Sequence, residues 1–228
     1  MKRHLPNAIT CCNLICGCIA TGFALRPDYG TALAFIIAGA VFDFFDGFTA
    51  RLLHVSSPVG KELDSLADDI TFGFAPAAIV FSLLGETAAG TFGPYFAYTA
   101  FLIAAFSALR LAKFNLDPRQ STTFIGLPTP ANALFWAALA TGAHERMDRL
   151  PYAPALLTAG IALSCWLLVC EVPMFALKFK SYGWRGNEIR YGFILASGAL
   201  LGLLGWTGFS LIIVLYVIVS VFTNKCKS

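Results

Sequence analysis

Apolar runs about as long as a membrane is thick recur along the whole of this chain. A helix needs about 20 apolar residues to cross the hydrocarbon core of a bilayer. Hydrophobic residues make up 57% of the sequence and charged residues 13%, whereas soluble domains carry roughly 25% charge. Too little polar surface is left to cover a soluble core, so the apolar remainder must face lipid. The sequence predicts an all-α, polytopic transmembrane helix bundle.

The pattern predicts about eight helices in a single domain over residues 1–228, because no internal repeat or low-complexity stretch divides the chain. The expected spans are 6–25, 31–53, 64–85, 93–114, 129–144, 152–171, 190–205 and 207–223. The first run has a basic start, but it is about 19 residues long and therefore long enough to be a retained helix. Lipidation at Cys11 or Cys12 is the alternative, and no small-residue cleavage pattern precedes these cysteines.

The distribution of lysine and arginine orients the bundle. With the N-terminus in the cytoplasm, 13 of the 16 basic residues fall on the cytoplasmic side. They are Lys2, Arg3, Arg51, Lys61, Arg110, Lys113, Arg119, Lys178, Lys180, Arg185, Arg190, Lys225 and Lys227. Such an excess is typical of cytoplasmic loops. We therefore expect an inner-membrane protein with both termini in the cytoplasm. Its basic edge would attract lipid or nucleotide phosphates, and the chain has no basic domain for nucleic acid.

Carboxylates inside the apolar runs point to function, because a charge in the bilayer costs a few kcal/mol. Asp43 and Asp46 lie three residues apart, and Asp64 and Asp68 lie four apart, so each pair shares one helix face. A loop of about ten residues, 53–63, would make the two helices antiparallel neighbours. Both acidic faces can then converge near the cytoplasmic surface. Four carboxylates in one pocket repel one another unless cations lie between them.

These oxygen ligands suit Mn²⁺ or Mg²⁺. We expect two ions, roughly 3.5–4 Å apart, that clamp a phosphoryl group. Gly47 and Ala50 continue the face of Asp43 and leave room for a ligand beside the helix backbone. Arg51 ends the same helix, and its guanidinium can bind phosphate through a fork of donors. The combination predicts a pyrophosphate site. The competing interpretation is a structural ion-pair network, for which few cations lie near in the sequence.

The segment DFFDGFTARLLHVSSPVGKELDSLAD resembles the signature of the CDP-alcohol phosphotransferase family, D-x2-D-G-x2-A-R-x8-G-x3-D-x3-D. All the specified positions match: Asp43, Asp46, Gly47, Ala50, Arg51, Gly60, Asp64 and Asp68. The resemblance implies a six-helix catalytic core, usually in a homodimer, with a polar cavity that faces the cytosol. It also implies that the four aspartates are metal ligands. Asp68 would in addition be the base that deprotonates the acceptor alcohol, which then attacks the β-phosphate of a CDP-lipid and releases CMP.

The resemblance also implies contacts with the nucleotide. Gly47 and Arg51 would contact it, and Ser57 in the loop is a further candidate for binding phosphate or nucleotide. The start LPNAIT resembles the start of family members, which would bring Asn7 and Thr10 near the cytidine. Helix capping explains these last two residues equally well.

Several further stretches resemble the branch of the family that uses serine as its acceptor. They are ELDSLADDITFGFAPA, RLAKFN at 110–115, FIGLPTPANA at 124–133 and, more loosely, EVPMFALKFK at 171–180. This branch transfers the phosphatidyl group of CDP-diacylglycerol to L-serine, giving phosphatidylserine and CMP. Arg110, Lys113 and Asn115 are then candidates for binding the serine carboxylate. They fit equally well as anchors on the positive side of the membrane.

Asp69 departs from the apolar residue that is usual at its position in this branch. By helical spacing, Asp69 and Glu62 point away from the paired aspartates. We therefore expect both to be solvated or capping carboxylates, outside the metal site.

Other functions stay open from the residues alone. Glycerol phosphate or inositol phosphate could replace serine, although a phosphorylated acceptor needs an extra basic cluster. Intramembrane prenyltransferases carry acidic motifs on well-separated helices, whereas Asp46 and Asp64 are 18 residues apart (64 − 46). An ion-coupled transporter would repeat its acidic motif, and this chain holds one copy. His4, His54 and His144 lie at separate loop edges, so no histidine-based catalytic set is expected.

Overall fold

The computed structural model of the protein describes residues 4–55, 57–87, 93–117, 125–147, 150–174, 183–184 and 187–225. The elements in chain order are α1 (Leu5–Ala24), α2 (Tyr29–Leu52), α3 (Pro58–Asp68), the π-helix η2 (Asp69–Phe74), α4 (Ala75–Thr87), α5 (Gly93–Ala97), the 3₁₀-helix η3 (Tyr98–Phe101), α6 (Leu102–Leu116), α7 (Thr129–Met147), α8 (Ala153–Val169), α9 (Glu188–Leu204), the 3₁₀-helix η5 (Gly205–Thr207) and α10 (Gly208–Lys225). Each predicted span has a helical counterpart within these residues, which confirms the all-α architecture.

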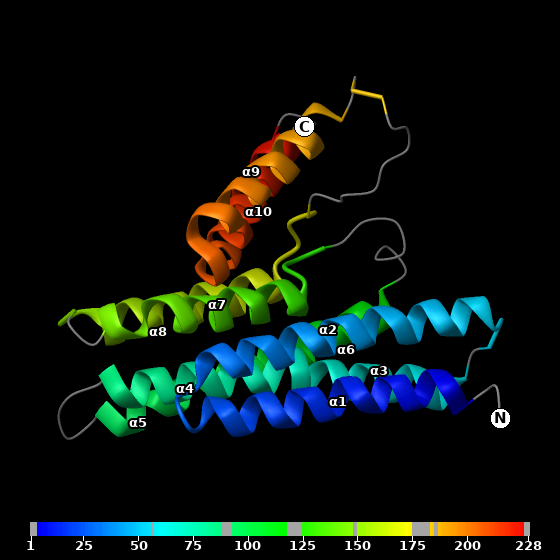
Figure 1. Ribbon diagram of the computed structural model, residues 1–228, viewed down its shortest axis with the longest axis horizontal. Coiled ribbons are helices and arrows are strands. Elements are labelled where there is room, and N and C mark those ends of the chain that lie inside the picture. Colours follow the sequence, from blue (N-terminus) through cyan, green and yellow to red (C-terminus); the bar gives the residue numbers. More distant parts are fainter. Residues whose placement is uncertain are drawn as a thin grey trace.

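The long helices form a layered bundle. In Figure 1, α1, α2, α3, α4 and α6 run side by side along the long axis. The α7–α8 hairpin runs in about the same direction along one side of this group, and α9 and α10 rise from it at an angle. An antiparallel bridge between Ile125 and Pro173 joins the segment before α7 to the segment after α8. The acid-bearing helices α2 and α3 both pack against α1, and α2 also packs against α7.

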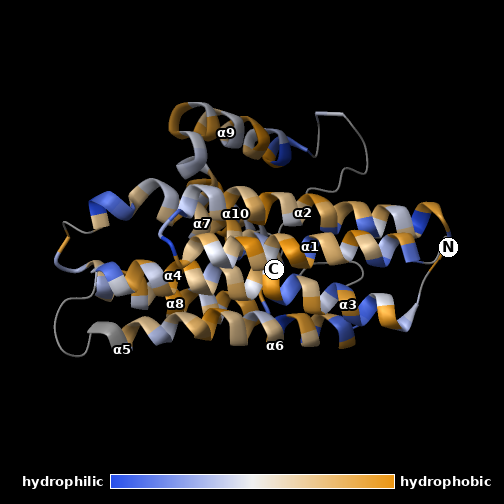
Figure 2. Ribbon diagram, turned by 60° about the horizontal axis from the view of Figure 1, so that its bottom comes forward, coloured by the Kyte–Doolittle hydropathy of each residue, from blue (hydrophilic) through white to orange (hydrophobic). Residues whose placement is uncertain are grey.

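In the part of the chain that the structure describes, five helical segments are long and apolar enough to cross a membrane. They are Leu5–Ala24, Tyr29–Leu52, Pro58–Thr87, Tyr95–Leu116 and Glu188–Thr223, and α8 is a shorter apolar helix. Figure 2 shows hydrophobic residues along most of the outer faces, with hydrophilic residues gathered toward helix ends and around α3. Large apolar side chains such as Leu116 and Leu203 are 85% and 83% exposed. A soluble protein rarely exposes so wide an apolar surface to water. The protein is an integral membrane protein.

Local sequence explains where the first two helices begin and end. Pro6 lies in the first turn of α1, where its missing N–H needs no partner. Asp28 caps α2, because its carboxylate accepts a hydrogen bond from the N–H of Thr31 at 3.0 Å. That bond favours the ionised form and holds the pKa of Asp28 below its ordinary value. After α2, His54 adopts a left-handed φ of 50°, which ends the helix.

The third helix begins earlier than predicted, at Pro58 instead of residue 64. Ser57 caps it by accepting the N–H of Gly60 at 2.9 Å, and the ring of Pro58 favours a first helical turn. The polar pair Lys61 and Glu62 made this turn look like a loop in the sequence. The loop after α2 is therefore shorter than expected, and Asp64 lies inside α3, about two turns from its start.

Small side chains let the helices of the core approach closely. Buried alanines occur on most of the packed helices: Ala20, Ala24, Ala32, Ala67, Ala75, Ala77, Ala78, Ala133 and Ala137. The largest fully buried side chain is Trp136, whose Nε1 donates to the Ser164 hydroxyl at 3.0 Å. A Cβ on Gly160 would lie 2.9 Å from the Trp136 ring, so α8 needs glycine there. This packing fixes α7 and α8 against the helices that carry the acidic residues.

Candidate active site

Three aspartates from two helices meet beside α1. One carboxylate oxygen each from Asp43 of α2 and from Asp64 and Asp68 of α3 lie within 4.8 Å of one another. All three side chains are half-buried. Among the described residues, no lysine or arginine forms an ion pair with them. Like charges this close and partly removed from water repel strongly, so the arrangement calls for a cation.

Asp46 lies next to this group of three. Its side chain is 6% exposed, and its Oδ2 is buried with no hydrogen-bond partner in the described part of the chain. It interacts electrostatically with Asp43, Asp64 and Asp68. Its carboxylate also meets the Thr10 hydroxyl, which donates to a backbone carbonyl of α1 at 3.0 Å. A buried carboxylate oxygen without a partner is costly, and a cation at this position would satisfy it.

The chemistry of the donors fits a hard divalent metal ion. The four side chains offer carboxylate oxygens, with no sulfur or imidazole nitrogen among them. Oxygen-only sets of this kind are typical of Mg²⁺ and Mn²⁺. The orphaned oxygen of Asp46 and the close trio of Asp43, Asp64 and Asp68 both fit such an ion. The sequence motif therefore corresponds to one site in space, although its members are spread over two helices.

The α2 residues predicted to contact the nucleotide lie on the helix turn that follows the aspartates. The Arg51 guanidinium folds back over Gly47, and its Nη1 would be 3.5 Å from a Cβ at that glycine. Ala50 is half-buried on the same helix. In this structure the guanidinium covers the backbone at Gly47, and its movement would let a ligand approach between the two. A larger residue at Gly47 would occupy the space in front of the guanidinium.

The predicted contacts from α1 and α3 converge at the starts of these helices. A Cβ on Gly60 would lie 3.0 Å from the Ser57 hydroxyl and 3.1 Å from the Asn7 side-chain oxygen. Asn7, Ser57 and Gly60 are therefore neighbours, and Thr10 lies one turn further along α1, at Asp46. Ser57 lies at the end of the loop, as expected, and is also the N-cap of α3. Its exposed hydroxyl is held by a backbone N–H at the edge of the site.

Two of the three acceptor candidates line a cavity of about 350 Å³ between α6 and the end of α8. Arg110 and Lys113 contribute cations to its wall, and Asp117 and Glu171 contribute carboxylates. Arg110 is 7% exposed, its Nε has no hydrogen-bond partner among the described residues, and it interacts electrostatically with Asp68. Arg110 therefore connects this cavity with the aspartate site.

The third acceptor candidate, Asn115, serves helix packing. Its amide donates to the Ser65 hydroxyl at 2.7 Å, and Lys61 donates to its backbone carbonyl at 3.3 Å. These bonds join the end of α6 to α3. Asn115 does not belong to the residues that line the cavity.

Asp69 also differs from expectation. It begins η2, is not one of the three converging carboxylates, and its Oδ1 is buried without a hydrogen-bond partner in the described residues. This oxygen is therefore not solvated, contrary to expectation: a Cβ on Gly73 would lie 2.6 Å from it, and η2 packs against α6. The residue itself occupies the C-cap position of α3.

Sequence reasoning missed one residue that touches the site. The amide of Asn13, in the middle of α1, donates to Asp68 Oδ1 at 3.2 Å. The available signal was a polar side chain inside an apolar run, since such groups in membrane helices face the protein interior. Asn13 lies outside the sequence motif, which runs from Asp43 to Asp68.

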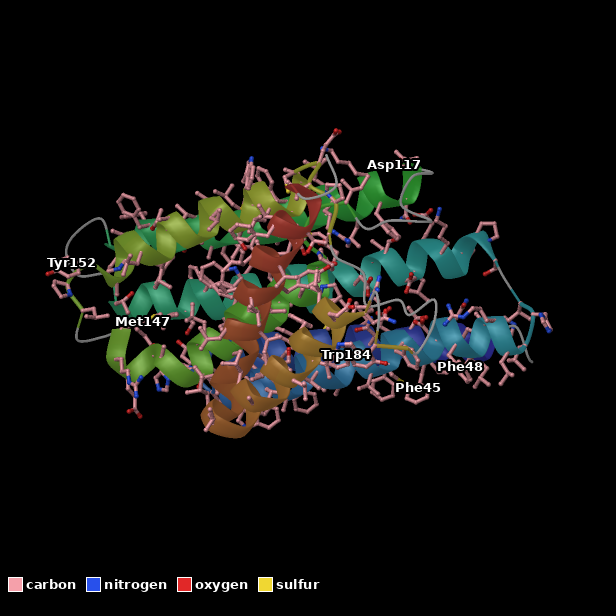
Figure 3. All side chains as sticks on the ribbon, turned by 90° about the horizontal axis from the view of Figure 1, so that it is seen from above. Phe45, Phe48, Asp117, Met147, Tyr152 and Trp184 are labelled. Atoms are coloured by element: carbon pink, nitrogen blue, oxygen red, sulfur yellow. The ribbon has the colours of Figure 1, made fainter. Side chains whose placement is uncertain are left out.

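The site lies toward one end of the bundle. Figure 3 shows Phe45 and Phe48 of α2 and Asp117 after α6 toward one end, and Met147 and Tyr152 toward the other. Phe45 lies between Asp43 and Asp46 in the sequence, so the aspartates belong to the first end. An end position brings the site near the membrane surface, where a polar head group can reach it.

Comparison with known proteins agrees with this geometry. The family model for CDP-alcohol phosphatidyltransferase matches residues 3–178. The CDP-diacylglycerol–serine O-phosphatidyltransferase of Bacillus subtilis is 34% identical over 171 residues, covering 75% of this chain and 89% of that protein. The enzymes of the same name from Mycobacterium tuberculosis and Saccharomyces cerevisiae are 33% and 35% identical, over 75% and 65% of this chain and 60% and 58% of their own lengths. Family members generally depend on a divalent metal, and the aspartate cluster suits one. The chain belongs to the CDP-alcohol phosphatidyltransferase family.

Proposed function

We propose that the protein transfers the phosphatidyl group of CDP-diacylglycerol to L-serine, giving phosphatidylserine and CMP. The observation that carries this proposal is the convergence of Asp43, Asp64 and Asp68 at one point, with Asp46 beside them. The names of the similar enzymes support serine as the acceptor. A cavity that carries both signs of charge also suits a zwitterionic amino acid.

In the proposed reaction, Asp68 accepts the proton of the serine hydroxyl. The serine oxygen then forms a bond to the β-phosphorus of CDP-diacylglycerol, and the bond between this phosphorus and the bridging oxygen breaks. CMP leaves with that electron pair. Arg51 and the backbone at Gly47 would hold the nucleotide phosphates, while Asn7, Thr10, Ala50, Ser57 and Gly60 would border the nucleotide. Arg110 would bind the serine carboxylate close to Asp68.

In our proposal the four aspartates would hold two divalent metal ions per site, either Mn²⁺ or Mg²⁺. Bound metal would neutralise the diphosphate and stabilise negative charge on the leaving oxygen. Parts of the site are shielded from bulk water, because Asp46 and Arg110 are 6% and 7% exposed. Strong electrostatic interactions in such a poorly hydrated site favour the charged transition state.

We further propose that the whole chain works as one domain in the inner membrane, as a homodimer, with the site and both termini in the cytoplasm. Support comes from the excess of basic residues on that side of the predicted loops. Of the thirteen, Lys2, Arg3, Arg119, Lys178, Lys180, Arg185 and Lys227 lie outside the described residues. Arg51 lies near the end of α2. Lys61, in the first turn of α3, donates to the backbone carbonyl of Asn115 at the end of α6, the helix that carries Lys113.

The choice of acceptor is tested with purified protein, CDP-diacylglycerol and Mn²⁺ or Mg²⁺, following CMP release. We expect serine to drive release, and glycerol 3-phosphate and inositol phosphate to leave it at the level without acceptor. A phosphorylated acceptor would need more cations than Arg110 and Lys113, the two that the described residues contribute to the cavity wall. CMP release with inositol phosphate and not with serine would contradict the proposed acceptor while keeping the proposed chemistry.

Arg110→Gln should raise the KM for serine by about 10- to 100-fold, because a charge-assisted hydrogen bond is worth about 1.5–3 kcal/mol. The KM for CDP-diacylglycerol should change little. Lys113→Gln is the matched control: Lys113 lines the same cavity but is exposed, where a charge contributes less. Steady-state kinetics on both variants checks this. An equal KM for serine in Arg110→Gln and the unmodified protein would remove Arg110 from the acceptor site.

A further inference from the structure

Asn13 occupies an unusual position for an amide on a membrane helix. Its side chain is fully buried, at 0% exposure, on the face of α1 that meets the acidic residues. Its Nδ2 donates to Asp68 Oδ1 at 3.2 Å, across 55 positions of sequence. An ionised carboxylate accepts hydrogen bonds and donates none, so the amide N–H is the group that Asp68 requires here.

A second bond ties the same residue to the same turn. The Thr71 hydroxyl donates to the backbone carbonyl of Asn13 at 2.9 Å. Thr71 is itself fully buried, in η2, three residues after Asp68. The main chain of Asn13 is thus fixed to residue 71 while its side chain is fixed to residue 68. The two bonds set the position of the amide relative to the carboxylate.

Asn13 lies where three helical segments pack closely. A Cβ on Gly17 would lie 2.5 Å from the Thr71 hydroxyl, and a Cβ on Gly39 would lie 2.9 Å from Asn13 Oδ1 and 2.6 Å from Thr71 Cγ2. Helices α1, α2 and η2 therefore touch at backbone distance around this residue. Asn13 Oδ1 is buried without a partner among the described residues, so only its N–H₂ end forms a bond.

We infer that Asn13 is a positioning residue that holds one oxygen of Asp68 and so directs the other toward the metal and the acceptor hydroxyl. This inference rests on the proposed roles of Asp68. Hydrogen-bond donors behind metal-binding carboxylates orient them, and their loss typically costs about 10- to 100-fold in metal affinity or activity. Asn13 is absent from the sequence signature and acts through Asp68 alone.

Asn13→Asp tests the inference, since it keeps the shape of the side chain and replaces the donor by a charged acceptor. We expect the Mn²⁺ concentration that gives half of the maximal rise in Tm to increase by about 10- to 100-fold, with a fall in kcat of similar size. The KM for CDP-diacylglycerol should stay within about twofold, because no substrate contact is removed. Asn13→Ala removes the donor without adding charge and should change both quantities in the same direction.

Asn132→Asp is the matched control. Asn132 is also fully buried, on α7, and its Oδ1 accepts a hydrogen bond from Ser164. Burying a carboxylate there should lower the Tm without changing the Mn²⁺ dependence. The inference fails if Asn13→Asp and Asn13→Ala keep the Mn²⁺ response and kcat of the unmodified protein. It also fails if Asn132→Asp weakens the Mn²⁺ response and lowers kcat as much as the Asn13 variants do. An unmodified protein without serine-dependent CMP release or Mn²⁺ stabilisation would instead contradict the proposed function itself.

Discussion

Asp68→Asn is expected to lower kcat by about a hundred- to ten-thousand-fold, which is the range for loss of a general base. Asparagine keeps the size of the side chain but accepts no proton from the serine hydroxyl. It also leaves only Asp43 and Asp64 of the converging group charged. The variant should still insert into the membrane and bind nucleotide, because Arg51 and Gly47 are unchanged. Single-turnover CMP release and equilibrium binding of CMP measure the two effects separately.

The neighbouring carboxylate supplies the control for that experiment. Asp69→Asn makes the same chemical change one residue away, on a side chain outside the converging group. Its kcat should stay close to that of the unmodified protein. Near-normal turnover in Asp68→Asn would mean that another group is the base. Equal losses in both variants would mean that the damage comes from disturbing the turn.

Removal of divalent metal should abolish turnover and reduce thermal stability together. Without cations, Asp43, Asp46, Asp64 and Asp68 repel one another in a partly buried site. A ligand that binds the folded state at 100 times its Kd stabilises it by about 2.7 kcal/mol. We therefore expect a chelator to lower the Tm in detergent, and Mn²⁺ or Mg²⁺ to restore both the Tm and CMP release.

The double variant Asp43→Asn/Asp64→Asn controls for non-specific effects of metal on the detergent-solubilised protein. It removes two of the repelling charges, so its Tm without metal should not fall below that of the metal-free unmodified protein. Added Mn²⁺ should then leave its Tm unchanged. If Mn²⁺ raised the Tm of this variant as much as that of the unmodified protein, the stabilising metal would bind elsewhere.

The helices could be predicted from sequence because the membrane sets their length. An apolar run near 20 residues forms a helix in lipid, because a helix satisfies all of its backbone hydrogen bonds within the segment. Each predicted span has a helical counterpart in the structure. The start of α3 could not be predicted in this way. Its first turn carries Lys61 and Glu62 outside any apolar run, and only the cap at Ser57 and Pro58 marks it. Hydropathy therefore located the helices better than their ends, although only five of the described helical segments are long and apolar enough to cross a membrane.

The candidate site was predictable where local spacing decides geometry. Asp64 and Asp68 share a face because they lie on one helix, and the short connection brings Asp43 close to them. The bond from Asn13 to Asp68 joins residues 55 positions apart and has no local signature. The cavity around Arg110 depends equally on the packing of α6 against α8. Contacts of this kind follow from tertiary packing, which spacing along the chain does not encode.

The π-helix η2, Asp69–Phe74, changes the angular relation between the two halves of the third membrane helix. Each residue of an α-helix turns the side-chain direction by about 100°, and a π-turn accommodates one more residue than an α-turn does. The acid-bearing α3 and the core-forming α4 are therefore out of phase by about one residue. A helical wheel drawn through 58–87 as an unbroken α-helix would assign Asp64 and Ile79 to the wrong relative faces. With the offset, a single rod can turn its carboxylates toward α2 while its other half buries Ile79 and Leu83 in the core.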